Sequence, residues 1–159
     1  MTDAARVIAL LGLEPLPREG GYYAETYRAR ERVRGGARSL ATAIYYLVTP
    51  ESFSAMHRVA SDEMFHFYAG DAVELLVLDP ATGGRLVALG ADLEAGERPQ
   101  ALVPAGAWQG ARLAPGGRWA LLGTTVFPGF EFADFEAGDA EALAAAWPAF
   151  AGAIRARAR

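Results

Sequence analysis

The sequence predicts an all-β fold, either a sandwich or a barrel of short strands. Segments rich in β-branched and aromatic residues recur at even spacing through the middle of this 159-residue chain. Short runs rich in glycine, proline and aspartate separate these segments, as expected for hairpins and turns. No helical periodicity interrupts the series, which argues against a parallel sheet with crossover helices. A short helix is expected near each end of the chain.

The first expected element is a short helix that ends at Leu11. Thr2 or Asp3 supplies its N-cap, because either side-chain oxygen accepts hydrogen bonds from the free amides of the first turn. Gly12 then supplies the stop, since glycine adopts the left-handed conformation at low cost.

Strand character begins in residues 19–27, E-G-G-Y-Y-A-E-T-Y, because tyrosine and threonine favour a pleated, half-buried surface. Residues 39–49 form a longer β-branched and aromatic run, which predicts a strand buried on at least one face. The remaining strands are expected at residues 53–59, 63–68, 73–78, 85–90, 100–103, 108–113 and 119–127.

The last expected element is an alanine-rich helix capped by Asp139. Pro148 ends or kinks this helix before a final segment that reaches Arg159. The sequence shows no internal repeat, linker or low-complexity block. We therefore expect a single domain over residues 1–159, long enough to build one full core.

Composition excludes several classes of function. The formal net charge of −4 argues against nucleic-acid binding, which needs a cationic face. The absence of cysteine excludes disulfides and thiolate metal sites, and fits a cytoplasmic protein. No stretch approaches the ~20 apolar residues that a membrane helix needs, so no membrane partner is expected.

Residues 56–71, M-H-R-V-A-S-D-E-M-F-H-F-Y-A-G-D, gather the side chains best suited to metal binding or proton transfer. The stretch places His57, Glu63 and His66 within one strand, turn and strand. These two histidines are the only ones in the chain. Because imidazole changes its protonation state near neutral pH, any chemistry is expected to pass through this stretch.

The spacing within this stretch resembles the first motif of the cupin superfamily. That motif is a glycine, five residues, H-x-H, three or four residues, a glutamate, six residues and a glycine. In this chain His57, Val59, Glu63 and Gly70 stand at the last four of these fixed positions. Valine thus replaces one of the two histidines.

The second cupin motif, P-x-G followed by two residues and a histidine, is matched by Pro104, Gly106 and Gln109, with glutamine in place of histidine. Four longer blocks resemble the small, mostly uncharacterised proteins of cupin family five. They are residues 19–27, 61–71, 103–109 and 128–136. The resemblance covers nearly the whole chain and implies an all-β double-stranded β-helix, or jelly-roll barrel, with an internal pocket, short terminal helices and often a homodimeric assembly.

Cupin family five also resembles the deoxysugar-nucleotide 3,5-epimerases. These are metal-free cupin-fold enzymes in which a barrel histidine removes a proton next to a ketone. His57 occupies the comparable first-motif position. The resemblance therefore implies a metal-independent sugar isomerase or epimerase with His57 as general base and Glu63 as its partner, although a shared fold alone does not transfer function.

Strand alternation predicts which of these side chains meet. If Glu63 points into the barrel, Phe65 and Phe67 also point inward, whereas His66 points outward. His66 is therefore expected to be structural, packed under an outer element or at a subunit contact.

The expected pocket contains His57, Glu63 and Gln109 beneath an aromatic wall. Trp108 either lines this pocket or covers the barrel rim. Glu131 either orients His57, as a third group usually holds a catalytic histidine, or is simply exposed. The expected ligand-binding residues are Tyr45 (or Tyr46), Phe65, Phe67, Trp108, Gln109 and Glu131.

Three interpretations of the polar centre stay open at this point. His57 acts as a general base, or the polar groups orient a ligand without chemistry, or His57 and Glu63 satisfy each other as a structural pair. No metal is predicted, because metal-binding cupins usually supply three imidazoles and one carboxylate. A site of His57, Glu63 and Gln109 would bind a divalent ion only weakly.

Residues 28–38, R-A-R-E-R-V-R-G-G-A-R, form the one basic cluster of the chain. They suit either a solvated hairpin or a clamp for phosphate or carboxylate. The sequence as a whole therefore predicts a cupin barrel that binds a small polar or anionic organic ligand. The alternatives are a non-catalytic small-molecule binding protein and, less favoured, a metal-dependent oxygenase.

Overall fold

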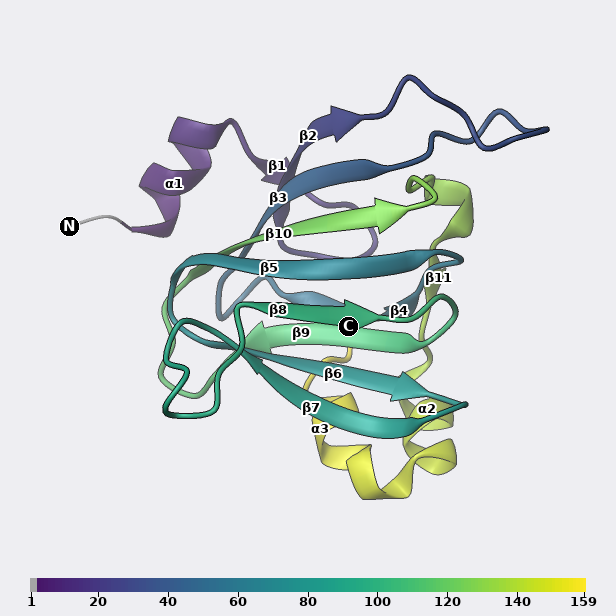
Figure 1. Cartoon of the computed structure of the whole chain (residues 1–159). Coiled ribbons are helices and arrows are strands. Elements are labelled where there is room, and N and C mark those ends of the chain that lie inside the picture. The colour runs from purple at the N-terminus through teal and green to yellow at the C-terminus, as the bar shows by residue number, and fades with distance from the viewer. Residues whose placement is uncertain (1–2) are drawn as a thin grey trace.

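The computed structural model describes residues 3–159 and contains two sheets that face each other as a jelly-roll barrel (Figure 1). All the paired strands within each sheet are antiparallel. The first sheet has the order β1 (Glu14–Pro15), β2 (Tyr22–Arg28), β3 (Thr42–Val48), β10 (Ala120–Phe127), β5 (Asp62–Gly70) and β8 (Gln100–Val103). The second has the order β11 (Glu136–Ala137), β4 (Ser54–Arg58), β9 (Trp108–Leu113), β6 (Val73–Asp79) and β7 (Gly83–Leu89). The predicted all-β barrel is confirmed.

Most strands lie within two or three residues of their predicted positions, and the differences occur at turns. Residues 19–21 form a bend before β2 instead of the start of the strand, because Gly20 and Gly21 both have positive φ. The segment after β10 contains a short 3₁₀ helix, η1 (Phe132–Asp134), which was not predicted. The two-residue strands β1 and β11 were not predicted, since such short pairings leave no periodic signal.

The terminal helices begin and end as the capping signals predict. In α1 (Ala4–Leu11), the side chain of Asp3 accepts a hydrogen bond from the Arg6 amide at 2.9 Å, and Gly12 closes the helix with φ 63°. The alternative cap, Thr2, lies outside the described residues. Asp139 caps α2 (Ala140–Ala146) in the same way, and η2 (Pro148–Phe150) then leads into α3 (Ala151–Arg155). Within residues 3–159 no helix is long and apolar enough to cross a membrane.

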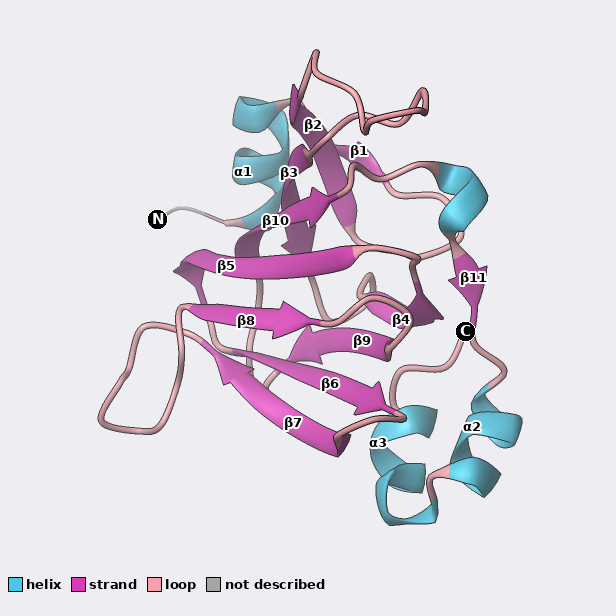
Figure 2. Ribbon diagram, turned by 45° about the vertical axis from the view of Figure 1, so that its right-hand side comes forward, coloured by secondary structure: helices cyan, strands magenta, loops and turns pink. Residues whose placement is uncertain are grey.

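Three apolar clusters hold these layers together. The largest fills the barrel between the sheets and includes Phe65, Leu75 and Leu122. A second packs α1 against the outer face of the first sheet, and a third packs the C-terminal helices against the outer face of the second sheet (Figure 2). Both sheets are therefore covered on parts of both faces.

Arg157 fixes the C-terminal segment to the second sheet. Its side chain is 1% exposed and donates hydrogen bonds to the carbonyl oxygens of Gly110, Ala153 and Glu74 at 3.1, 2.8 and 2.9 Å. Burial lowers the pKa of the Arg157 guanidinium to about 10. The residue remains charged at neutral pH, so these carbonyls bind a buried cation.

Candidate functional site

A cavity of about 280 Å³ opens between the two sheets. It lies just below the ~300–1,000 Å³ range typical of ligand pockets, which suits a molecule of monosaccharide size. Its walls combine apolar and ionisable side chains from β2, β3, β4, β5, β10 and the loops that flank them. The lining residues are Leu16, Glu19, Tyr23, Glu25, Arg28, Thr42, Ile44, His57, Val59, Glu63, Thr124, Val126, Phe130, Glu131 and Phe132.

His57 lies on β4 with its ring 2% exposed and one edge in the cavity wall. Its Nδ1 is 2.8 Å from the carbonyl oxygen of Ala55. Because a carbonyl only accepts, this contact places the ring hydrogen on Nδ1 and leaves the Nε2 lone pair free. Within residues 3–159 Nε2 makes no hydrogen bond, and the Glu19 Oε1 atom lies 3.7 Å from it.

Two side chains fix the plane of the imidazole. The ring of Phe135 stacks on His57 with a centroid separation of 5.1 Å and an interplanar angle of 14°. The Arg18 guanidinium lies 4.6 Å from the centroid of Phe135 and donates to its carbonyl oxygen at 3.4 Å. The orientation of Nε2 is therefore set by packing as well as by the Ala55 carbonyl.

Glu63 is a buried carboxylate on β5, 9% exposed. Its Oε2 accepts a hydrogen bond from Gln109 Nε2 at 2.8 Å. Burial and the nearby charge of Glu19 raise its pKa, against the smaller lowering effects of His57 and of hydrogen bonds from Gln109 and Thr124. Glu63 therefore keeps its proton to higher pH than an exposed glutamate, as a general acid requires.

Glu19 supplies a second carboxylate to the inner end of the cavity. Its Oε1 accepts a hydrogen bond from Ser54 Oγ at 2.8 Å and faces His57. Glu19 was not predicted as a site residue, because it lies in a turn with no periodic pattern. The available signal was the Gly20–Gly21 pair that follows it, since positive φ at both glycines turns the chain sharply at this point.

The outer part of the cavity is formed by Arg28 and two acidic partners. Arg28 lies 2.7 Å from Glu25 and 3.0 Å from Glu131, and it also donates to the carbonyl oxygen of Phe130. The rings of Phe130 and Phe132 contact each other edge to face, with their centroids 5.2 Å apart. The positive charge of Arg28 is therefore already shared between two carboxylates.

The structure brings several predicted site residues together. His57, Val59, Glu63 and Glu131 line the cavity, and Gln109 lies directly behind Glu63. The side chain of Gln109 is fully buried, and its Oε1 has no hydrogen-bond partner among residues 3–159.

Other predicted residues lie elsewhere. Phe65 and Phe67 point inward, but they pack in the barrel core beyond the cavity. Tyr45 packs on the outer face of β3 near α1, and the inward residue is Tyr46, whose hydroxyl donates to the Gly20 carbonyl at 2.7 Å. The expectation for Tyr45 was wrong because α1 covers that face, so both faces of β3 are apolar.

Trp108 and Glu131 also differ from their predicted roles. Trp108 faces outward, packed with the C-terminal helices and with Arg58 over its ring at 4.6 Å. Glu131 pairs with Arg28 instead of orienting His57, because the Ala55 carbonyl and Phe135 already hold the imidazole.

His66 lies on the outer face of β5. Its Nε2 is 3.2 Å from Thr125 Oγ1, its Nδ1 is 3.2 Å from Gln100 Nε2, and its ring stacks on Tyr68. It is therefore outside the cavity, on the opposite side of the sheet from Glu63.

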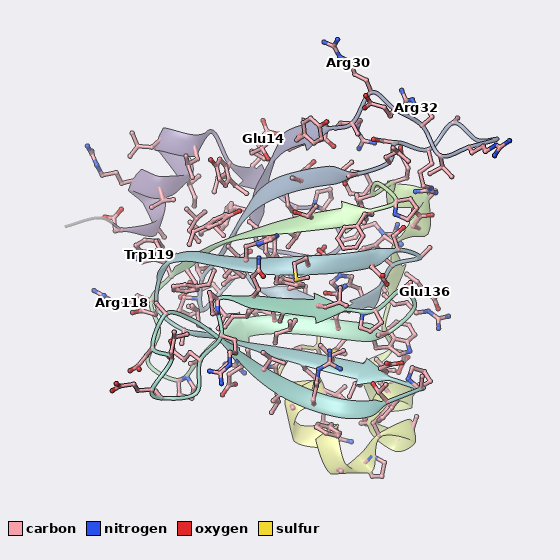
Figure 3. All side chains as sticks on the ribbon, in the orientation of Figure 1. Glu14, Arg30, Arg32, Arg118, Trp119 and Glu136 are labelled. Carbon is pink, nitrogen blue, oxygen red and sulfur yellow. The ribbon has the colours of Figure 1, made fainter. Side chains whose placement is uncertain are left out.

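Most of the basic cluster does not reach the cavity. Figure 3 shows Arg30 and Arg32 on the loop after β2, beyond the edge of the barrel. Arg38 forms an ion pair with Asp134 and donates to the Gly129 carbonyl. Arg28 alone lines the cavity, and its charge is paired.

The donor set does not fit the metal that many cupins hold. Val59 places an alkyl group where the first motif has a second histidine, and the Gln109 amide group points its nitrogen toward Glu63. Among the described residues 3–159, no group of three or more histidine, cysteine, aspartate or glutamate side chains is arranged to hold a metal ion.

Restoring both histidines should create a metal site. The double variant Val59→His with Gln109→His adds two imidazoles near His57. Position 109 on β9 lies directly opposite His57 on β4 in the strand register. We expect Zn²⁺ or Ni²⁺ at about 100 times its Kd to stabilise this variant by ~2.7 kcal/mol and the parent hardly at all. Thermal unfolding with and without metal measures this difference, and equal shifts in both proteins would contradict the inward geometry of these two positions.

Glu63→Gln should stabilise the protein at neutral pH. Because the folded state raises the pKa of Glu63, the protonated form contributes stability below the ordinary value of 4.5, and this contribution is lost as pH rises through the folded-state pKa. Glutamine stays neutral and still accepts from Gln109, so we expect a gain of about 1 kcal/mol, or ~2–4 °C in Tm, at pH 8 and little gain at pH 4. The exposed variant Glu94→Gln serves as control, and a gain that does not grow with pH would contradict the assignment.

Comparison with known proteins gives a family match across most of the chain. The model of the family described as Cupin superfamily (DUF985) matches residues 5–138. The uncharacterized protein YML079W of Saccharomyces cerevisiae is 29% identical over 133 residues, which cover 74% of this chain and 66% of that protein. The chain thus spans just under two thirds of the length of this relative.

Solved structures show the same architecture. A hypothetical protein from Leishmania major matches with a TM-score of 0.89 and 36% identity, over 99% of both chains. Protein SO0799 from Shewanella oneidensis matches with a TM-score of 0.89 and 38% identity, over 100% of this chain and 99% of that one. Oxalate decarboxylase from Bacillus subtilis matches with a TM-score of 0.57 and 15% identity over 90% of this chain and 36% of that one, a likeness of fold alone.

Proposed function

Since this chain belongs to the Cupin superfamily (DUF985), we propose that its barrel binds a small polar organic molecule and transfers a proton on it, as a metal-independent isomerase or epimerase of sugar-like substrates. The observation that carries the proposal is the free Nε2 atom of His57. It lies in the cavity wall on a ring whose tautomer and plane are fixed. A preset, unpaired basic nitrogen is what proton abstraction next to a carbonyl needs.

The proposed reaction uses His57 and Glu63 as a pair. His57 Nε2 takes the proton from a carbon next to the substrate carbonyl, and the electrons of that C–H bond move to the carbonyl oxygen. Protonated Glu63 donates its proton to this oxygen, which gives an enol and a carboxylate. For an isomer, protonated His57 gives its proton to the former carbonyl carbon, and the hydroxyl on the first carbon returns a proton to Glu63. For an epimer, water protonates the opposite face of the first carbon, the enol hydroxyl returns its proton to Glu63, and His57 releases its proton to solvent.

Exchange of solvent deuterium into a ketose tests this function. D-Fructose, 1-amino-1-deoxy-D-fructose and 5-keto-D-gluconate are probes of neutral, positive and negative charge. In D₂O we expect the protein to incorporate deuterium at the carbon next to the carbonyl of at least one of them, detected by NMR. Exchange no faster than in heat-denatured protein for all three would contradict the proposed function.

A second candidate is a binding protein without turnover. The apolar wall of Leu16, Ile44 and Val126 around a few polar groups supports it, because many binding sites combine such surfaces. A small molecule that copurifies with the protein, is identified by mass spectrometry and shows no exchange in D₂O would favour this candidate over the isomerase.

A further inference from the structure

We infer that the ligand of this cavity is a small organic cation of the amino-sugar type, with its ammonium group bound between Glu19 and Glu63. This inference rests on the proposed small-molecule site and assigns the charge of its ligand. It replaces the anionic ligand that the basic cluster suggested.

The charges that line the cavity point to a cation. Four carboxylates line it, Glu19, Glu25, Glu63 and Glu131, against one guanidinium, that of Arg28. Arg28 is already paired with two of these carboxylates. An anion would therefore meet net negative charge with no free cation to bind it, and its desolvation would be uncompensated.

Among residues 3–159 no arginine forms an ion pair with either of the two inner carboxylates. Glu19 accepts from the neutral hydroxyl of Ser54, and Glu63 accepts from the neutral amide of Gln109. The nearest ionisable group of opposite type is His57, whose Nε2 lies 3.7 Å from Glu19 Oε1. Because buried charges in proteins are normally paired, this arrangement leaves room for a positive group supplied by the ligand.

The free Nε2 of His57 independently indicates a ligand at the same place. His57 is 2% exposed, yet this nitrogen makes no hydrogen bond within the described residues. An ammonium group carries three donors, and Glu19 and Glu63 satisfy two of them. The Nε2 lone pair then remains for the proton on the carbon that carries the amine. Because a bound ammonium stabilises the ionised form of Glu63, Glu63 binds such a ligand as a carboxylate and does not act as the acid toward it.

Aromatic side chains farther out suit the same class of ligand. Tyr23, Phe130 and Phe132 line the cavity. Aromatic faces attract cations through the ring quadrupole and also pack against the apolar face of a sugar ring. The cavity volume of about 280 Å³ limits the ligand to about one sugar unit.

Binding of three sugars that differ mainly in charge tests the inference. The probes are D-glucosamine, D-glucose and D-glucuronate at about pH 7, where an amine retains its proton. Binding is measured by titration of the protein amide and imidazole NMR signals. We expect glucosamine to bind about 10–100-fold more tightly than glucose, and glucuronate to bind most weakly, because each charge-assisted hydrogen bond contributes about one to two orders of magnitude in Kd.

Matched variants distinguish a direct effect of Glu19 and Glu63 on sugar affinity from the effect of a changed net charge. Glu63→Gln and Glu19→Gln should each weaken glucosamine binding about tenfold or more and leave glucose binding within about twofold. Glu94→Gln removes the same charge from the exposed loop between β7 and β8, at the opposite end of the barrel from η1 and β11 (Figure 1), and should change neither affinity.

Three outcomes overturn the inference. Glucuronate binding as tightly as glucosamine would overturn the positive charge assigned to the ligand. It would not overturn the proposal that the cavity binds a small molecule. Unchanged glucosamine binding in Glu63→Gln and Glu19→Gln would place the ammonium elsewhere. Signals that do not move with any of the three sugars would also overturn it, whereas the proposed function is judged separately by deuterium exchange.

Discussion

Replacing His57 with asparagine is expected to lower the rate of solvent deuterium incorporation by at least ~100-fold. The asparagine amide can still donate to the Ala55 carbonyl, which His57 contacts through Nδ1 at 2.8 Å. Asparagine offers no basic nitrogen to the cavity. The variant therefore loses the base but keeps the other side chains that line the cavity. The rate is measured by NMR in D₂O with the ketose that exchanges fastest with the parent protein.

The second histidine provides a matched control for this variant. His66 lies outside the cavity with Thr125 and Gln100, so His66→Asn should exchange within about twofold of the parent. Equal rates in the parent and His57→Asn would remove His57 as the base. Equal losses in both variants would indicate that the effect comes from altered folding, and circular dichroism of both proteins checks this.

The second large effect is expected on stability. Arg157→Ala removes a buried guanidinium that binds three carbonyl oxygens, those of Gly110, Ala153 and Glu74. Because the Gly110 carbonyl would be left buried without a donor and the other two, partly buried carbonyls would also lose theirs, we expect a loss of about 3–5 kcal/mol in the free energy of unfolding. For a chain of this length, that corresponds to a fall in Tm of roughly 6–20 °C, which calorimetry measures.

A neighbouring arginine serves as control for Arg157. Arg155 forms an ion pair with Glu141 at 2.9 Å, but both side chains are more than half exposed. Arg155→Ala should therefore cost no more than about 1 kcal/mol. Similar losses in the two variants would contradict the view that burial of the guanidinium, and not its charge alone, anchors the C-terminal segment.

The sequence predicted the strands and the inward faces best where one face is apolar and the other polar. On β5, alternation placed Phe65 inward and His66 outward, as the structure has them. On β3 the run of apolar residues is continuous, because α1 covers the outer face of the same strand. The sequence pattern therefore does not distinguish Tyr45 from Tyr46, and the residue that points inward is Tyr46.

Contacts between distant segments limited the prediction of the site. Glu19 reaches His57 from a glycine-rich bend 38 residues earlier in the chain, and Arg28 meets Glu131 from a separation of 103 residues. No local pattern reports such contacts. Residue type, spacing and resemblance identified His57 and Glu63, whereas the second carboxylate and the pairing of Arg28 required the folded chain.

We propose that the barrel performs proton transfer with its own side chains and without a metal. The most direct test is the rate of deuterium incorporation before chelation, after exhaustive chelation, and after addition of Mn²⁺, Fe²⁺ or Ni²⁺. Because the His57, Glu63 and Gln109 set does not fit these ions, we expect the same rate in all three states. A rate that falls on chelation and returns with one of the metals would contradict the claim.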